Sequence, residues 1–292
     1  MRSVLPLLLA AVTSAPVAAQ QAPRRIFISV DMEGIGGIGT SAMTTATGKD
    51  YATGRKLMTD EVNAVVAAIF AAGPAEVLVN DSHGDMQNLL HTELDRRVSY
   101  IQGAVKPLGM VQGLDSTFDA AIFLGYHARA GTENGFLAHT GSGIVKGLWI
   151  GDVEAGEGEM NAAYAGSLGV PVILASGDSV FAAQFTQHVP AATVVTKVAE
   201  TPAAARLRHP EVVREELASA TRSALASLES ARPWRIAAPV EVRIRFADVT
   251  RPQIMEAIPG VRQVDGYTVA FTANSMGEAY RLIRLLYRFV TI

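Results

Sequence analysis

Carboxylate and imidazole side chains follow short apolar runs at three separate places in the sequence. Asp31 and Glu33 come directly after the first run, His83 follows the second, and His127 follows the third. If the runs are parallel strands of one sheet, their carboxyl ends lie along one edge, where open α/β sheets bind ligands. We therefore expect these four side chains to lie close together.

The types of these side chains indicate a metal site. Asp31 and Glu33 are two residues apart, so they point the same way if the strand continues, and their charges repel unless a proton or cation lies between them. With two imidazoles added, oxygen and nitrogen ligands suit zinc, manganese or cobalt better than calcium or magnesium. Each residue taken alone is more often a cap, a turn residue or a hydrogen-bonded histidine. Their convergence is what favours a metal.

Two further candidates lie in the middle of the chain. His139 stands in a glycine-rich loop, and Glu157 opens a predicted helix whose start could direct its carboxylate at a cation. Alternatively, Glu157 and Glu159 are first-turn carboxylates that only complement the helix dipole, which is the more frequent situation for such residues. Glu159 could also add negative charge beside the metals.

Short apolar runs alternate with helix-like segments, which predicts an α/β fold with a largely parallel central sheet flanked by helices. Each run is apolar throughout, as expected for a strand buried on both faces. The predicted strands are 26–30, 77–79, 120–124 and 170–175, and the predicted helices are 54–72, 159–168, 178–188 and 210–230.

The pattern changes near residue 235. Residues 240–246 alternate apolar and charged side chains, which predicts a strand with one buried face. A second strand is expected at 267–272, and Ser275 to Glu278 form a capping-box pattern that opens a final apolar and basic helix. We predict a signal peptide at 1–19, an α/β metal-binding catalytic domain at 20–234 and a small C-terminal β-rich subdomain at 235–292.

Composition excludes several classes of protein. With 292 residues, 49% of them hydrophobic, the chain can bury a large core. Its formal net charge of -3 gives no basic field to attract nucleic acid or anionic lipid. The chain has no cysteine, so thiolate nucleophiles and Cys-ligated metals are excluded. Any metal must be bound by His, Asp or Glu.

The first twenty residues have the pattern of a cleavable signal peptide. Arg2 precedes an apolar stretch at 4–12, and Val17-Ala18-Ala19 provide the small residues of a cleavage site. The apolar stretch is shorter than the ~20 residues that span a bilayer. We expect cleavage after Ala19 and a periplasmic or secreted mature protein with no membrane partner.

Several short motifs occur together and in one order. The chain resembles the D-aminopeptidase (DppA) family of zinc peptidases in Ser29-Val30-Asp31-Met32-Glu33-Gly34, Asn80-Asp81-Ser82-His83, Gly125-Tyr126-His127-Ala128-Arg129, His139, Gly156-Glu157 and Asn161. The resemblance covers nearly the whole mature chain, and an ordered set is far more specific than any single motif.

The resemblance implies roles for these residues. Asp31 would bridge two zinc ions, with Glu33 and His83 completing one site and His127 and Glu157 the other; His139 would be the catalytic side chain. It further implies α/β subunits assembled into a ring-shaped homo-oligomer, such as a decamer, that removes N-terminal D-residues, notably D-Ala, from short peptides. Water activated by the two metals would then attack the peptide carbonyl.

Two other functions remain open on the residues alone. The first is another two-metal hydrolase, an amidase or a phosphoesterase. The second is an exported solute-binding protein that contains a structural metal, although the ligands exceed what one structural site needs.

Other polar residues have less definite predicted roles. Asp81 could orient the imidazole of His83. Arg129 and Lys197 could bind a substrate carboxylate, but a salt bridge or a solvated side chain is the more frequent situation. We interpret the remaining histidines, His91, His188 and His209, as structural or surface residues.

Overall fold

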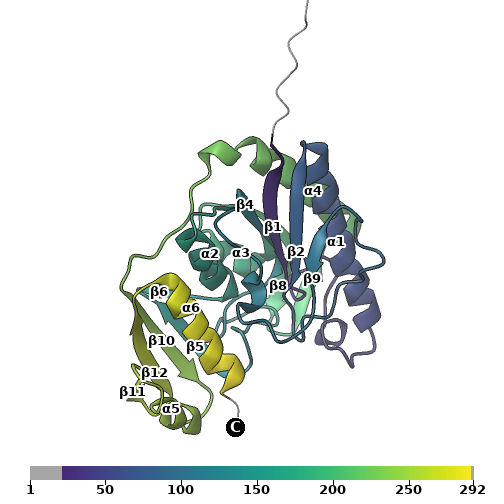
Figure 1. Ribbon diagram of the computed structural model, residues 1–292. Helices are drawn as coiled ribbons and strands as arrows, with labels where there is room; N and C mark the ends of the chain where they lie inside the picture. Colours follow the sequence, from purple (N-terminus) through teal and green to yellow (C-terminus); the bar gives the residue numbers. More distant parts are fainter. Residues whose placement is uncertain (1–21, 291–292) are drawn as a thin grey trace, which may run out of the picture.

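The main body of the protein is a seven-stranded sheet (Figure 1). The computed structural model describes residues 22–290, so the predicted signal peptide lies outside the described residues. The strand order is β3-β2-β1-β4-β7-β8-β9, and every neighbouring pair is parallel except β8 and β9. The strands are β1 (Arg24–Val30), β2 (Ala75–Asp81), β3 (Ser99–Ile101), β4 (Ala120–Tyr126), β7 (Val172–Asp178), β8 (Ala192–Thr201) and β9 (Ala204–Leu207).

Helices cover both faces of this sheet, which is why its central strands are apolar throughout. Successive side chains of β1 alternate between the two faces: Ile26 and Ile28 pack with α1 (Tyr51–Ala71) and α4 (Pro210–Ala226), whereas Phe27 belongs to the core formed with α2 (Glu157–Ser167) and α3 (Ser179–Phe185). Three short 3-10 turns lie in the connections, at Ser41–Met43, Gly109–Val111 and Leu228–Ser230. The predicted fold class is confirmed.

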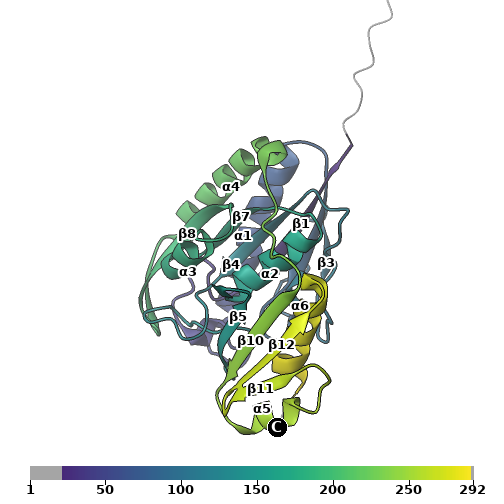
Figure 2. The ribbon, with the colours of Figure 1, turned by 90° about the vertical axis from the view of Figure 1, so that its left-hand side faces the viewer.

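A second, antiparallel sheet lies below the first (Figure 2). Its order is β11-β12-β10-β5-β6, formed by β5 (Val145–Ile150), β6 (Val153–Glu154), β10 (Val240–Phe246), β11 (Arg262–Asp265) and β12 (Thr268–Ala273), with the short helix α5 (Thr250–Met255) beside it. The segment from about 235 onward therefore does not form this sheet alone, because β5 and β6 come from the middle of the chain. The pairing of β5 with β10 joins distant segments, and no local sequence pattern reveals it.

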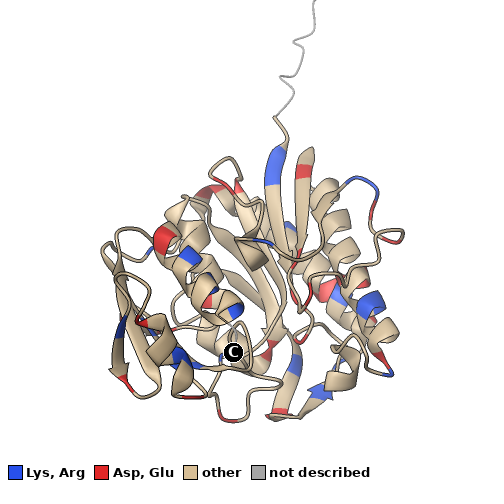
Figure 3. Cartoon of the chain, turned by 60° about the horizontal axis from the view of Figure 1, so that its bottom comes forward, with Lys and Arg blue, Asp and Glu red and all other residues tan. Residues whose placement is uncertain are grey.

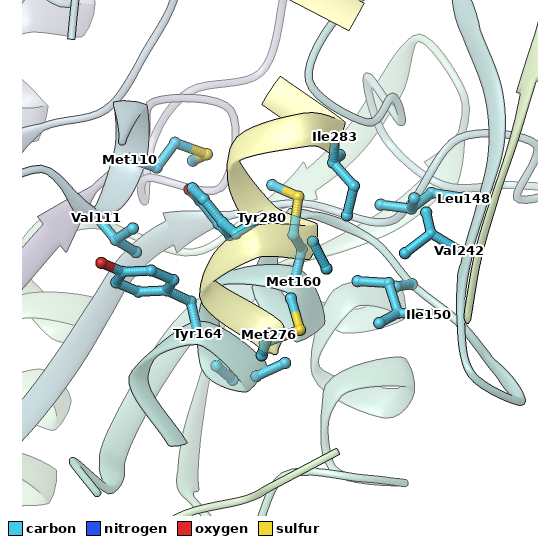
Figure 4. Packing of buried hydrophobic residues seen from close by; sticks show 14 of the residues in the cluster. Met110, Val111, Leu148, Ile150, Met160, Tyr164, Val242, Met276, Tyr280 and Ile283 are labelled. Carbon is cyan, nitrogen blue, oxygen red and sulfur yellow. The ribbon is translucent and has the colours of Figure 1, made fainter. Parts of the chain in front are cut away.

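Helix α6 (Met276–Arg284), followed by a π-helical turn (Leu285–Phe289), connects the two sheets. In Figure 4 its side chains lie between residues of the main body and residues of the second sheet. Those on the first side are Met110, Val111 and Tyr164; those on the second are Leu148, Ile150 and Val242. Packing on both sides fixes the C-terminal helix beside the main sheet. Within residues 22–290, no helix is both long enough and apolar enough to cross a bilayer.

Candidate metal centre

The turn after β1 is pressed against the end of β4. The N–H of Asp31 donates to the carbonyl of Leu124 at 2.8 Å, and that of Gly34 donates to Gly125 at 2.7 Å. A Cβ on Gly34 would lie 1.9 Å from the carbonyl oxygen of Tyr126, so only glycine allows this approach. The close passage brings the carboxylates after β1 next to the residues that follow β4.

His83, after β2, directs one ring nitrogen at these carboxylates. Its Nδ1 lies 3.2 Å from Asp31 Oδ1 and 2.9 Å from Glu33 Oε2. Its Nε2 lies 2.7 Å from the carbonyl oxygen of Thr44, which can only accept a hydrogen bond. The Nε2 therefore carries the proton in the neutral ring, and the lone pair of Nδ1 is available to a metal.

In His127 and His139, as in His83, one ring nitrogen is bonded to a backbone carbonyl, but here that nitrogen is Nδ1 and Nε2 is the one left for a metal. Nδ1 of His127 donates to the carbonyl of Ala128 at 3.0 Å, and Nδ1 of His139 donates to that of Leu137 at 2.9 Å. Nε2 of His127 is then free to face Asp31 Oδ2 at 3.3 Å and Glu157 Oε2 at 3.5 Å. Nε2 of His139 lies 3.7 Å from Glu157 Oε1.

The structure thus assembles every predicted site residue in one place. Two sets can each place three ligand atoms within 4.8 Å of one another. Asp31 connects them, because its two oxygens face His83 and His127 respectively. The sets are Asp31, Glu33 and His83, and His127, His139 and Glu157.

Buried polar atoms show that these residues fit a divalent cation. Oδ2 of Asp31, Oε2 of Glu33 and Nε2 of His127 are buried and have no hydrogen-bond partner among the described residues. Leaving such atoms unpaired is costly, and proteins seldom do so without a function. Carboxylate oxygen and imidazole nitrogen are zinc ligands, so zinc ions bound at the two sets would satisfy these three atoms.

The electrostatics of the site also favour positive charge. Burial raises the pKa of Asp31, and the charge of Glu33 raises it further. Burial opposes ionisation of Glu157 as well, but the neighbouring imidazole of His127 lowers the pKa of this carboxyl to about 2. Burial would lower the pKa of His127, yet Glu157 and Asp31 raise it well above its usual value. The carboxylates therefore attract cations, either protons on the imidazoles or metal ions.

A chain of buried hydrogen bonds connects the elements that carry the site. Ser29 lies 2.8 Å from Ser82 and 2.7 Å from the hydroxyl of Tyr126. Asn161 donates to Tyr126 at 2.9 Å and accepts from the hydroxyl of Tyr280 at 2.8 Å. These bonds join β1, β4, α2 and α6, so the position of the C-terminal helix is tied to that of the candidate metal ligands.

Asp81 forms no hydrogen bond with the imidazole of His83, so it does not have the orienting role that their proximity in sequence suggested. It accepts hydrogen bonds from the backbone N–H groups of Asn88 and Leu89, at 2.6 and 2.8 Å, and so holds the loop after His83. The carbonyl of Thr44 orients the imidazole instead. This partner is a backbone atom of a distant segment, which no residue type in the sequence could reveal.

Lys197 is completely buried, so it is not solvated, and it forms no salt bridge with another described residue. Its ammonium donates to the carbonyls of Glu33 and Ile38, each at 2.6 Å, while burial lowers its pKa to about 7. Lys197 therefore fixes the backbone that carries Glu33. Arg129, in contrast, forms a salt bridge with Glu154 at 2.8 Å.

Glu159 caps its own helix: its Oε2 accepts the N–H of Gly156 at 2.8 Å. The remaining histidines belong to neither set of candidate ligands. His209 caps the N-terminus of α4, His188 lies beside Trp234, and His91 is exposed.

A cavity of about 250 Å³ opens onto the metal centre. Asp31, His83, His139 and Glu157 line it, together with Arg284, Tyr287 and Arg288 of the C-terminal helix and turn. The sequence analysis missed these last three residues. One signal was present: Arg284 stands four positions after Tyr280, on the helix face that is otherwise apolar, which is unusual for a solvated arginine.

Comparisons with known proteins agree with the fold and with the predicted family. A family model described as D-aminopeptidase matches residues 24–285. The D-aminopeptidase of Bacillus subtilis (strain 168) is 35% identical over 264 residues, which cover 90% of this chain and 96% of the relative. A solved structure, described as the Zn-dependent D-aminopeptidase DppA from Bacillus subtilis, a self-compartmentalizing protease, superimposes with a TM-score of 0.87 at the same identity and coverage. The predicted resemblance and the predicted class of enzyme, a hydrolase of peptide bonds, are confirmed. The chain belongs to the D-aminopeptidase family.

Proposed function

We propose that this chain is an exported two-zinc D-aminopeptidase that removes the N-terminal D-residue, of the D-Ala type, from short peptides. One observation carries the two-metal part of the proposal. The two oxygens of the buried Asp31 carboxylate face different imidazoles, His83 at 3.2 Å and His127 at 3.3 Å. Because each imidazole is also close to a second carboxylate, Asp31 stands where a ligand shared by two cations belongs.

The described residues divide naturally between two ions. Asp31, Glu33 and His83 would hold one zinc, and Asp31, His127 and Glu157 the other. Zinc in this position would lower the pKa of a shared water toward about 7 and polarise the scissile carbonyl. The Zn-dependent relative of known structure supports zinc over other divalent metals.

His139 would act as the proton donor or hydrogen-bond donor at this centre. Its ring is held through Nδ1 by the carbonyl of Leu137, and 30% of its side chain remains exposed toward the cavity. Its Nε2 can therefore stabilise the developing oxyanion or protonate the leaving amine. The absence of cysteine from the sequence agrees with attack by water without a covalent thioester.

We also propose a ring-shaped homo-oligomer and export from the cytoplasm. The first is supported by the description of the related structure as a self-compartmentalizing protease, and light scattering on the purified protein tests it. The second rests on the pattern of residues 1–20, with cleavage after Ala19. A mature N-terminus at Gln20 in the periplasmic or extracellular fraction would support export, and cell-wall fragments would then be natural substrates. Recovery of the mature protein in the cytosol alone would contradict it.

The central experiment combines metal content with stereospecific turnover. We expect protein purified without chelator to contain about two zinc ions per chain and to consume D-Ala-D-Ala much faster than L-Ala-L-Ala. A phosphate ester serves as the matched alternative substrate for a two-metal phosphoesterase. Turnover of the ester without turnover of either peptide, or metal-free protein that zinc cannot activate, would contradict the proposal.

A further inference from the structure

The cavity at the metal centre has a basic wall that the two-metal chemistry does not use. Arg284, at the end of α6, and Arg288, in the following π-helical turn, line it together with Tyr287. Figure 3 shows basic residues on the helix that ends at the C-terminus. Carboxylates and imidazoles of the candidate metal centre, namely Asp31, Glu157, His83 and His139, line the same cavity.

Arg284 is a buried cation without a counter-ion. Only 4% of the residue is exposed, and no carboxylate oxygen within residues 22–290 lies within 4.0 Å of its guanidinium. It donates to the hydroxyl of Tyr287 at 2.8 Å and to the carbonyl of Lys106 at 3.1 Å, and its Nε has no partner among the described atoms. Neutral acceptors do not balance the charge, and burying an unpaired guanidinium is costly. An arginine in this state is suited to an anion supplied by a ligand.

The position of this guanidinium is fixed relative to the metal ligands. The guanidinium of Arg284 packs against Gly109, where a side chain would not fit, since a Cβ on Gly109 would clash with Cζ of Arg284. One helical turn earlier, the hydroxyl of Tyr280 is bonded to Asn161 and to the carbonyl of Leu108. Asn161 also donates a hydrogen bond to Tyr126, the residue before His127, so hydrogen bonds connect the helix that carries Arg284 to the strand that carries a candidate metal ligand.

We propose that Arg284 binds the C-terminal carboxylate of the substrate, so that the preferred substrates are dipeptides and other very short peptides with a free carboxyl end. The inference rests on the proposed function, which places the N-terminal residue at the metal centre. The only anion that an uncharged short peptide then offers is its terminal carboxylate, and guanidinium binds carboxylate through paired hydrogen bonds. Each residue spans at most ~3.6 Å, so a cavity of about 250 Å³ holds only a few residues. Arg288 is exposed and adds attraction at the rim.

The test compares D-Ala-D-Ala with its C-terminal amide, which differs only in lacking the negative charge. For the zinc-loaded wild type we expect kcat/KM to be about 10- to 100-fold higher for the free acid, the range expected for a hydrogen bond to a charged group. Arg284→Gln should abolish this preference, because KM for the acid rises until kcat/KM is the same for the two peptides. Arg284→Lys keeps the charge but cannot form the paired hydrogen bonds of a guanidinium, so it should give an intermediate preference.

Arg281→Gln is the matched control, because Arg281 is an exposed arginine of the same helix and does not line the cavity. Zinc content and thermal unfolding show whether Arg284→Gln remains folded. If it does not, the acid-to-amide ratio of the wild type still decides the matter. Equal turnover of both peptides by the wild type would overturn the role of Arg284 and leave the peptidase intact. No turnover of either peptide by the zinc-loaded enzyme would instead overturn the proposed function.

Discussion

The imidazole rings of His127 and His139 stack on one another, with centroids 4.1 Å apart and planes inclined by 16°. Both rings approach the same carboxylate, since Glu157 presents Oε2 to the buried ring and Oε1 to the more exposed one. The geometry alone would permit His139 to be a metal ligand or a carrier of protons. Removing the ring of a metal ligand would release zinc, whereas removing the ring of a proton carrier would stop turnover and leave zinc bound.

Replacing His139 should abolish turnover without removing metal. We expect His139→Ala to lower kcat by about 100- to 10,000-fold, the usual contribution of a general acid or base, while zinc content stays near two ions per chain. His83→Ala should lose zinc, and the exposed His91→Ala should change neither property. Elemental analysis and peptide turnover on the same preparations check this. Loss of zinc from His139→Ala would make His139 a ligand.

Asp31 and Glu33 should differ in how many ions they hold. Among the described residues, His83 is the only imidazole within 4.0 Å of the Glu33 carboxylate, so Glu33→Ala should leave about one zinc per chain. Asp31→Ala removes the shared ligand and should leave almost none. Zinc measured after dialysis against a weak chelator distinguishes the two variants. Equal zinc content in both would mean that Asp31 does not bridge.

Gly34 should tolerate no side chain. A Cβ at this position would lie 1.9 Å from a backbone oxygen of β4, and candidate metal ligands follow both β1 and β4. We expect Gly34→Ala to lower the free energy of unfolding by more than about 3 kcal/mol, as severe overpacking does, and to lose zinc. Gly143→Ala is the matched control: Gly143 lines the same cavity, but a Cβ there would meet no atom within 4 Å. Denaturant unfolding of both variants measures the difference, and similar stability would refute this reading of the turn.

Glu61 should make the protein less stable as the pH rises. One oxygen accepts the N–H of Gly36 at 2.6 Å and the other has no partner among the described atoms, while burial raises the pKa to about 7. A carboxyl whose folded pKa lies above its unfolded value of 4.5 favours folding when protonated, and this contribution is lost as the pH rises from about 4.5 through 7. The loss amounts to at most about 3 kcal/mol.

Glu61→Gln stays uncharged, so its melting temperature should rise relative to the wild type between pH 5 and pH 8. Thermal unfolding at several pH values, with zinc saturating, checks this trend. Glu215→Gln changes an exposed carboxyl of α4 and should follow the wild type throughout. A constant difference between Glu61→Gln and the wild type would show that the buried carboxyl does not titrate in this range.

The sequence by itself determined the central strands and most of the candidate metal ligands. Strands β1, β2, β4 and β7 could be recognised because burial on both faces requires uninterrupted apolar runs. The topology rule for parallel sheets then brought Asp31, Glu33, His83 and His127 to one edge. Glu157 and His139 followed from the ordered motifs of the family and not from their own surroundings.

Only the tertiary structure decided how these residues are oriented and what faces them. Which nitrogen of His83 is free depends on the carbonyl of Thr44, and the burial of Lys197 depends on two carbonyls of a distant loop. The antiparallel partner of β10 is β5, from the middle of the chain, and α6 packs between the two sheets so that Arg284 lines the cavity at the candidate metal centre. Contacts between segments far apart in sequence leave little local pattern, because the same side chains would suit many other partners.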